Sequence, residues 1–156
     1  NQKSAYRRLL FALVWFHAIL LERRKFKSLG FNIPYDFNES DFAICHDLII
    51  VFLDEYPSKI PFDAMKYLIA EANYGGRVTD DFDRRLVNVY IGELFCDSAV
   101  NTDGFLLSEL SHYHIPSDGE LQHYKDVIRS MPANDHPAAF GQHPRTGAGR
   151  AAQALV

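Results

Sequence analysis

The stretch Asn73-Tyr74-Gly75-Gly76-Arg77-Val78-Thr79-Asp80-Asp81 lies near the middle of the chain, between two segments with helical apolar periodicity. We expect Gly75 and Gly76, at least one of them with φ > 0, to end the first helix and reverse the chain. Thr79 or Asp80 can then accept the unpaired backbone N–H groups that open the second helix. The sequence therefore predicts a helix–glycine–helix corner with an arginine on its surface.

Apolar residues at three- and four-residue steps predict helices on both sides of this corner. The expected ranges are 4–28, 40–55, 61–73, 80–94 and 117–130, the last opened by a capping-box pattern at 117–120. We expect Ile44 and Cys45 to be buried on the second helix, and Phe82, Leu86 and Val89 on the fourth. Tyr90 is expected to be buried on the same face of this fourth helix.

The segments between these helices have their own signatures. Residues 31–37 alternate aromatic and polar side chains around a proline, which predicts an extended arm laid over the helices. Residues 105–107 and 113–115 can form a short hairpin after the turn at 101–104. One helical turn is expected at 137–140. Residues 145–156 are small and basic, and we expect them to be disordered and to contribute nothing to folding.

Bulk properties exclude several classes of function. A chain of 156 residues can bury one substantial core, and its formal charge of -4 disfavours nucleic-acid binding. Leu9–Leu21 is apolar, but His17 interrupts it and charges bound it too closely for a bilayer crossing. The basic run 23–27 suits a solvated helix end. The first residue is not Met, and we expect the chain to be a fragment of something larger.

Three segments, in the same order, resemble the motor region of dynein heavy chains: 22–41, 73–85 and 132–144, the last containing Phe140-Gly141-Gln142-His143-Pro144. In that family the matching region is the helical lid of the sixth AAA+ module of the motor ring. The segments 93–97 and 115–119 are more similar to axonemal than to cytoplasmic chains. The chain is therefore identified as a member of this family by resemblance.

The resemblance implies an all-α, AAA+ lid-type bundle of about five helices with a short irregular β element, covering residues 4–144. It implies a non-catalytic, mechanical role without a cofactor, in an axoneme of a cilium or flagellum. The partners would be neighbouring AAA+ modules and the C-terminal region of the same heavy chain, and through the whole motor the other dynein subunits and microtubules. The implied structural or interface residues are Gly75, Gly76, Arg77, Thr79, Asp80, Arg84 and Arg85.

We expect Arg77, held by the corner, to contact a carboxylate or carbonyl on a neighbouring element. Its replacement by Lys should then leave the stability of the lid almost unchanged while impairing motility. An alternative is a nucleotide-binding fragment that uses Arg77, although the sequence has no phosphate-binding glycine loop followed by Lys-Ser or Lys-Thr. A free-standing helical adaptor is the other alternative.

Other chemistry has weaker support. His112 and His114 have a spacing that suits a metal on a strand, but no Cys or carboxylate supports them. Cys45 and His46 are adjacent on a predicted helix, so their side chains diverge by about 100° and do not form a nucleophilic dyad. His17 fits a hydrogen-bonded core histidine.

Overall fold

The computed structural model describes residues 2–27, 30–133 and 136–141. The described part is all-α, as predicted, apart from one isolated β-bridge and the connecting segments. The chain divides into two compact units, Asn1–Asn101 and Thr102–Val156. The predicted disorder of residues 145–156 lies outside the described residues, as do Gln142, His143 and Pro144.

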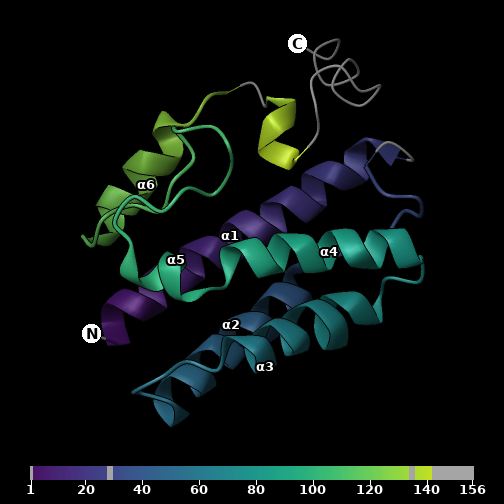
Figure 1. Cartoon of the computed structure of the whole chain (residues 1–156). Helices are drawn as coiled ribbons and strands as arrows, with labels where there is room; N and C mark the ends of the chain where they lie inside the picture. The colour runs from purple at the N-terminus through teal and green to yellow at the C-terminus, as the bar shows by residue number, and fades with distance from the viewer. Residues whose placement is uncertain (1, 28–29, 134–135, 142–156) are drawn as a thin grey trace. The chain divides into compact units, whose positions relative to one another are not determined.

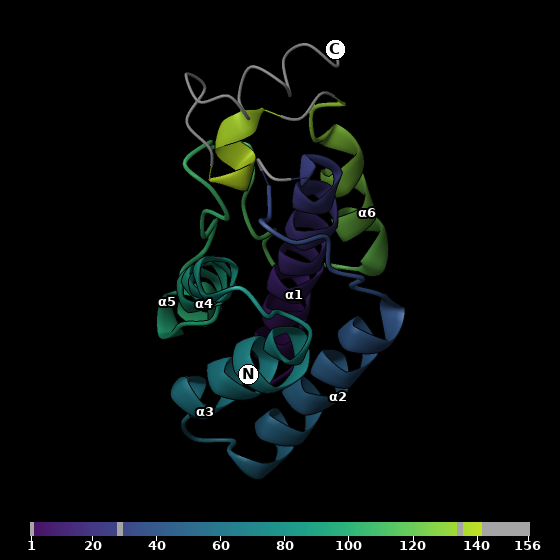
Figure 2. The same cartoon turned by 90° about the vertical axis from the view of Figure 1, so that its right-hand side faces the viewer.

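The first unit is built around one long helix, α1 (Gln2–Lys25), which packs against α2 (Glu39–Glu55), α4 (Asp81–Leu94) and α5 (Asp97–Asn101) (Figure 1). A second helical run lies beside α2 and consists of three parts. It starts as α3 (Phe62–Lys66), continues as the π-helix η2 (Tyr67–Asn73) and ends as the 3₁₀ turn η3 (Tyr74–Gly76). The turned view in Figure 2 separates α2 and α3 beside the end of α1.

The core lies along α1, where Leu9, Leu13, Phe16 and Leu20 are fully buried. The other helices contribute the buried residues Cys45, Ile49, Met65, Ile69, Val87 and Ile91. By length and composition α1 could cross a membrane, but half of its most apolar window is buried within the protein. This burial favours a core helix over a membrane span.

The buried face of α4 differs in part from the predicted one, although Tyr90 is buried as predicted. Phe82 is 72% exposed and Val89 is also exposed, whereas the inward side chains are Asp83, Val87, Tyr90, Ile91 and Leu94. In the first two turns the inward residues are Asp83 and Val87 instead of Phe82 and Leu86, a shift of one residue or about 100° that places the Asp83 carboxylate against the hydrogen-bond donors of the preceding arm. On α2, Cys45 is buried as predicted, as are the later core residues Ile49, Phe52 and Leu53, whereas the prediction was wrong for Ile44, which is exposed.

As predicted, the arm at 31–37 packs over the helices and forms no strand, although it bends at Asn32 and Ile33. Its aromatic residues Phe31, Tyr35 and Phe37 are buried and contact one another. The Asp83 carboxylate accepts hydrogen bonds from the backbone N–H of Asn32 at 3.0 Å and from the Tyr35 hydroxyl at 2.9 Å. A buried carboxylate with these donors fixes the arm to α4.

The basic run at the end of α1 is only partly solvated. Arg23 is buried, and its guanidinium donates to the Gly30 carbonyl at 3.0 Å and to the Tyr90 hydroxyl at 2.9 Å. Arg24 instead pairs with the exposed Asp36. The prediction of a solvated helix end was therefore wrong for Arg23, since a fixed guanidinium can satisfy several buried acceptors at once.

The corner is not the positive-φ turn that was predicted, because neither Gly75 nor Gly76 has a positive φ. Both belong to the 3₁₀ turn η3 that extends the π-helix. A Cβ on Gly75 would lie 2.2 Å from the carbonyl oxygen of Ala70, whereas a Cβ on Gly76 would have no atom within 4 Å. Glycine is required at position 75 by close backbone approach.

The second unit contains α6 (Leu121–Ser130) and the 3₁₀ turn η4 (Pro137–Phe140). The predicted hairpin forms as a β-bridge between Leu106 and His114, flanked by backbone hydrogen bonds. The predicted helical turn at 137–140 is also present. The capping box at 117–120 was wrong, since α6 follows Glu120 without a side-chain cap.

Candidate functional site: a polar junction around Asp41

Asp41 is a charged residue in the first turn of α2, and its side chain is only 4% exposed. The backbone N–H of Asn38 donates to its Oδ2 at 3.0 Å, while the Asn38 side chain accepts from the Ser40 and Asp41 N–H groups. This is a capping box with Asn and Asp in its two positions. Forming the box directs the carboxylate inward, toward the corner.

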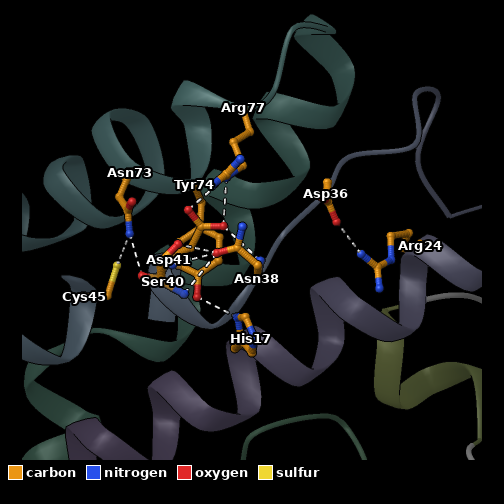
Figure 3. A network of polar contacts seen from close by, with 10 residues as sticks. All are labelled: His17, Arg24, Asp36, Asn38, Ser40, Asp41, Cys45, Asn73, Tyr74 and Arg77. Carbon is orange, nitrogen blue, oxygen red and sulfur yellow. Dashed lines mark hydrogen bonds and ion pairs between the residues drawn. The ribbon is translucent and has the colours of Figure 1, made fainter. Parts of the chain in front are cut away.

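Arg77 reaches this carboxylate from the corner, with Nε 2.9 Å from the Asp41 oxygens (Figure 3). The side chain of Arg77 is 40% exposed. We call Asp41 together with His17, Asn38, Asn73, Tyr74 and Arg77 the polar junction. The prediction that Arg77 contacts a carboxylate on another element agrees with this geometry, but the partner lies within the chain itself.

Asn73, the last residue of η2, joins the same junction. Its side-chain amide donates to the Asp41 carbonyl at 2.7 Å and to the Cys45 sulfur at 2.9 Å. Burial raises the pKa of the Cys45 thiol to about 12, so this thiol is not a reactive nucleophile. His46 bonds to the Tyr6 hydroxyl at 2.8 Å instead, in keeping with the rejected Cys45–His46 dyad.

Tyr74 links the junction to α1. Its hydroxyl shares a 2.7 Å hydrogen bond with Nδ1 of the half-buried His17, which agrees with the prediction of a satisfied core histidine (Figure 3). Burial lowers the pKa of His17, although the nearby charge of Asp41 opposes this effect. Burial also raises the pKa of Tyr74. Both side chains are therefore neutral near pH 7.

Arg84 and Asn88 on α4 hold the other side of the π-helix. Arg84 donates to the Glu71 carboxylate at 3.1 Å and to the Val78 carbonyl at 2.6 Å, and Asn88 donates to Glu71 at 2.6 Å. Glu71 lies within η2. The π-helix is thus held by polar contacts toward α2 on one side and α4 on the other.

The remaining predicted residues lie at the start of α4. Asp80 is the N-cap and accepts from the Phe82 and Asp83 N–H groups, while Thr79 is exposed and does not cap the helix. The N–H of Asp83 is the main cause that lowers the pKa of Asp80. Arg85 is exposed, and its guanidinium lies 5.8 Å from the centre of the Phe82 ring.

The structure brings Gly75, Arg77 and Arg84 close to the junction and leaves Gly76 and Arg85 outside it. Sequence reasoning missed Asp41, whose i, i+3 relation to Asn38 is a recognisable capping pattern. Asn73 and Glu71 carry no such local pattern. In the described part of the chain no three His, Cys, Asp or Glu side chains form a metal-binding group. The arrangement is that of a mechanical brace between helices.

Comparisons with known proteins all point to the same family. The family described as the dynein heavy chain AAA lid domain matches residues 6–146. The chain is 58% identical over 139 residues, 89% of its length, to the dynein-1-beta heavy chain of the flagellar inner arm I1 complex of Chlamydomonas reinhardtii. It is 54% identical over 144 residues, 92% of its length, to dynein axonemal heavy chain 2 of Mus musculus. It is 46% identical over 138 residues, 88% of its length, to dynein axonemal heavy chain 3 of Homo sapiens.

In each of these comparisons the chain spans about 3% of the length of the relative. The resemblance inferred from the three motifs is confirmed at the level of the family.

Proposed function

Because this chain belongs to the family of dynein heavy chain AAA lid domains, we propose that it is the non-catalytic lid of the sixth AAA+ module of an axonemal dynein heavy chain. In this role residues 4–144 form the lid, and they transmit ATP-driven rearrangement within a microtubule motor. Its place is the axoneme of a cilium or flagellum, in keeping with the axonemal and flagellar names of its relatives. The family match over residues 6–146 supports these bounds.

The ion pair between Arg77 and Asp41 is the observation that carries the mechanical role. A lid arginine that contacts a nucleotide must keep its guanidinium available to a phosphate. Here Nε of Arg77 is engaged by a buried carboxylate of its own chain, at 2.9 Å. The sequence also lacks a P-loop, which supports a lid that hydrolyses nothing by itself.

The outward surface of α4 supplies a place for neighbouring modules of the same heavy chain to bind. Phe82, Arg85 and Val89 lie at i, i+3 and i+7 spacing and are all exposed, and we call them the α4 outer face. Exposed apolar residues at helical spacing are typical of a surface that another protein segment covers. Contacts at this face would join the lid to the rest of the heavy chain. Through the whole motor, the lid would then be linked to the other dynein subunits and to microtubules.

Equilibrium binding of labelled ATP to the isolated chain separates this role from the nucleotide-binding alternative. We expect no binding at micromolar ATP. Micromolar affinity that is lost in Arg77→Ala would contradict the mechanical role and favour nucleotide binding.

Microtubule gliding tests the motor role directly. Residues 6–146 of this chain would replace the matched region of the Chlamydomonas heavy chain, with Phe82→Ser as the variant and Val14→Ser, on the exposed side of α1, as the control. We expect Phe82→Ser to slow gliding while the control keeps the parental velocity. Equal velocities in variant, control and parent would show that the α4 outer face makes no working contact.

A further inference from the structure

The π-helix η2 (Tyr67–Asn73) has a backbone register that an α-helix could replace. The N–H of Tyr74 bonds to the carbonyl of Ile69, five residues earlier, where an α-helix would use the residue four earlier. Each hydrogen-bonded ring of this run therefore encloses one residue more than a ring of the α-helix from which it continues. Most π-helices are single-turn bulges inside α-helices and are frequent at functional sites.

Gly75 makes the wide register sterically possible. The Ala70 carbonyl approaches so closely that a Cβ at position 75 would lie 2.2 Å from its oxygen. Gly76 has no such neighbour. The glycine that the wide turn requires thus lies within four residues of the side chains whose tertiary contacts hold it, from Glu71 to Arg77.

Two sets of contacts hold the register from opposite sides. On one side, Tyr74 bonds to His17 of α1 and Arg77 pairs with Asp41 of α2 (Figure 3). On the other side, Glu71 accepts from Arg84 and Asn88 of α4. A shift to the α-helical register would put Asn73 in the place of Tyr74 and rotate the following side chains by about 100°. The contacts of Tyr74 and Arg77 would then break together and move relative to Glu71, which holds the run to α4.

We propose that residues 67–76 are a register switch that couples α2 to α4 by passing between this π-helical register and an α-helical one. The contacts of Arg77 with Asp41 and of Tyr74 with His17 are the latch of the π-helical state. A contact that displaces either α4 or α2 would shift the equilibrium between the same two registers. Such a shared two-state element is the physical requirement for coupling the surfaces of the two helices. The switch is a property of this chain and does not depend on the proposed role in a motor.

The first experiment measures the minor register in the full 156-residue chain by ¹⁵N relaxation dispersion. We expect millisecond exchange at the amides of residues 67–77 and at those of His17 and Asp41. Arg77→Lys weakens the latch and should increase this exchange several-fold. Arg24→Lys alters another Arg–Asp pair, which is exposed and lies outside the latch, and it should leave the millisecond exchange unchanged. Absence of exchange in both the wild type and Arg77→Lys overturns the switch.

The second experiment uses two deletions that are matched in residue type and exposure. Ala72 lies in the π-helix and Ala43 in the regular helix α2, and both are exposed. Deleting Ala72 lets the Tyr74 N–H meet the Ile69 carbonyl in an α-helical bond while Tyr74 and Arg77 keep their partners. We expect this variant to fold, with an unfolding midpoint near that of the wild type and without the millisecond exchange.

Deleting Ala43 rotates every following core residue of α2 and should lower the unfolding midpoint strongly. If deletion of Ala72 destabilises the chain as much as deletion of Ala43, the π-helix has no α-helical alternative and the switch is overturned.

Discussion

Arg77 and Asp41 form an ion pair across 36 residues of sequence, with Nε of the arginine 2.9 Å from the carboxylate. The pair connects the corner after the π-helix to the first turn of α2. Asp41 is buried and also caps the backbone of Asn38, so one carboxylate stabilises a helix start and fixes the corner. This contact makes Arg77 an internal brace.

We expect Arg77→Ala to lower the free energy of unfolding by about 1–3 kcal/mol, because a buried carboxylate loses a charged donor. Arg77→Lys should cost about 1 kcal/mol, since the ammonium cannot reproduce the Nε geometry. This revises the expectation that Arg77→Lys leaves stability unchanged. Urea unfolding of Arg77→Ala, Asp41→Ala and the double variant measures the coupling. Additive effects within error would show that the two side chains do not interact.

Gly75→Ala and Gly76→Ala should differ in their effect on thermal unfolding. The added Cβ at position 75 meets the Ala70 carbonyl oxygen, whereas position 76 opens to free space. We expect Gly75→Ala to lower the midpoint by several degrees. Gly76→Ala should leave it unchanged or raise it slightly, because Ala restricts the unfolded chain. A larger loss at position 76 would mean that the corner has a different backbone conformation.

Asp83→Asn should release the 31–37 arm from α4. The carboxylate accepts from two backbone N–H groups and the Tyr35 hydroxyl, and an amide can offer only one acceptor oxygen. We expect a loss of about 1–3 kcal/mol and faster hydrogen exchange at the amides of Asn32 and Ile33. Tyr35→Phe removes a single donor and serves as the milder control. Unchanged exchange in Asp83→Asn would disprove the tether.

Acidification should destabilise the chain through His17. Burial lowers the pKa of His17 in the folded state, so the unfolded chain binds the proton first. The contribution of neutral His17 is fully present above the unfolded-state pKa of about 6.5 and is lost as the pH falls toward the lower folded-state value. We expect His17→Gln to lose less stability than the wild type between about pH 7.5 and about pH 5.5. If the stability of His17→Gln and of the wild type falls in parallel with pH, His17 is not the cause of the acid destabilisation.

The helices and their approximate ends were predictable because their signals are local. Apolar residues at three- and four-residue steps mark α1 and α2, and Asn38 and Asp80 are good N-caps wherever they precede such a pattern. The hairpin at 105–115 and the turn at 137–140 depend on nearby residues as well. The three motifs that resemble dynein heavy chains were also readable without a structure.

The partners of the charged residues were not predictable, because they are far apart in sequence. From the sequence, Arg77 is equally compatible with a nucleotide or a neighbouring module, because its partner Asp41 lies 36 residues away. Asp83 lies in the first turn of α4, and no local pattern marks it as buried. Its burial follows from donors on the arm, about 50 residues earlier in the chain, and it sets which face of α4 turns inward.

By itself the sequence determined the all-α class, the approximate ranges of the longer helices and the family, whereas the short α5 was not predicted. Only the tertiary structure decided the register of residues 67–76 and the rotation of α4. Helix periodicity and capping depend on residues a few positions apart, so they can be recognised in a short segment of the sequence. The π-helix and the inward Asp83 exist because distant donors and acceptors, at Asp41, Arg84 and Asn32, must be satisfied when the helices pack.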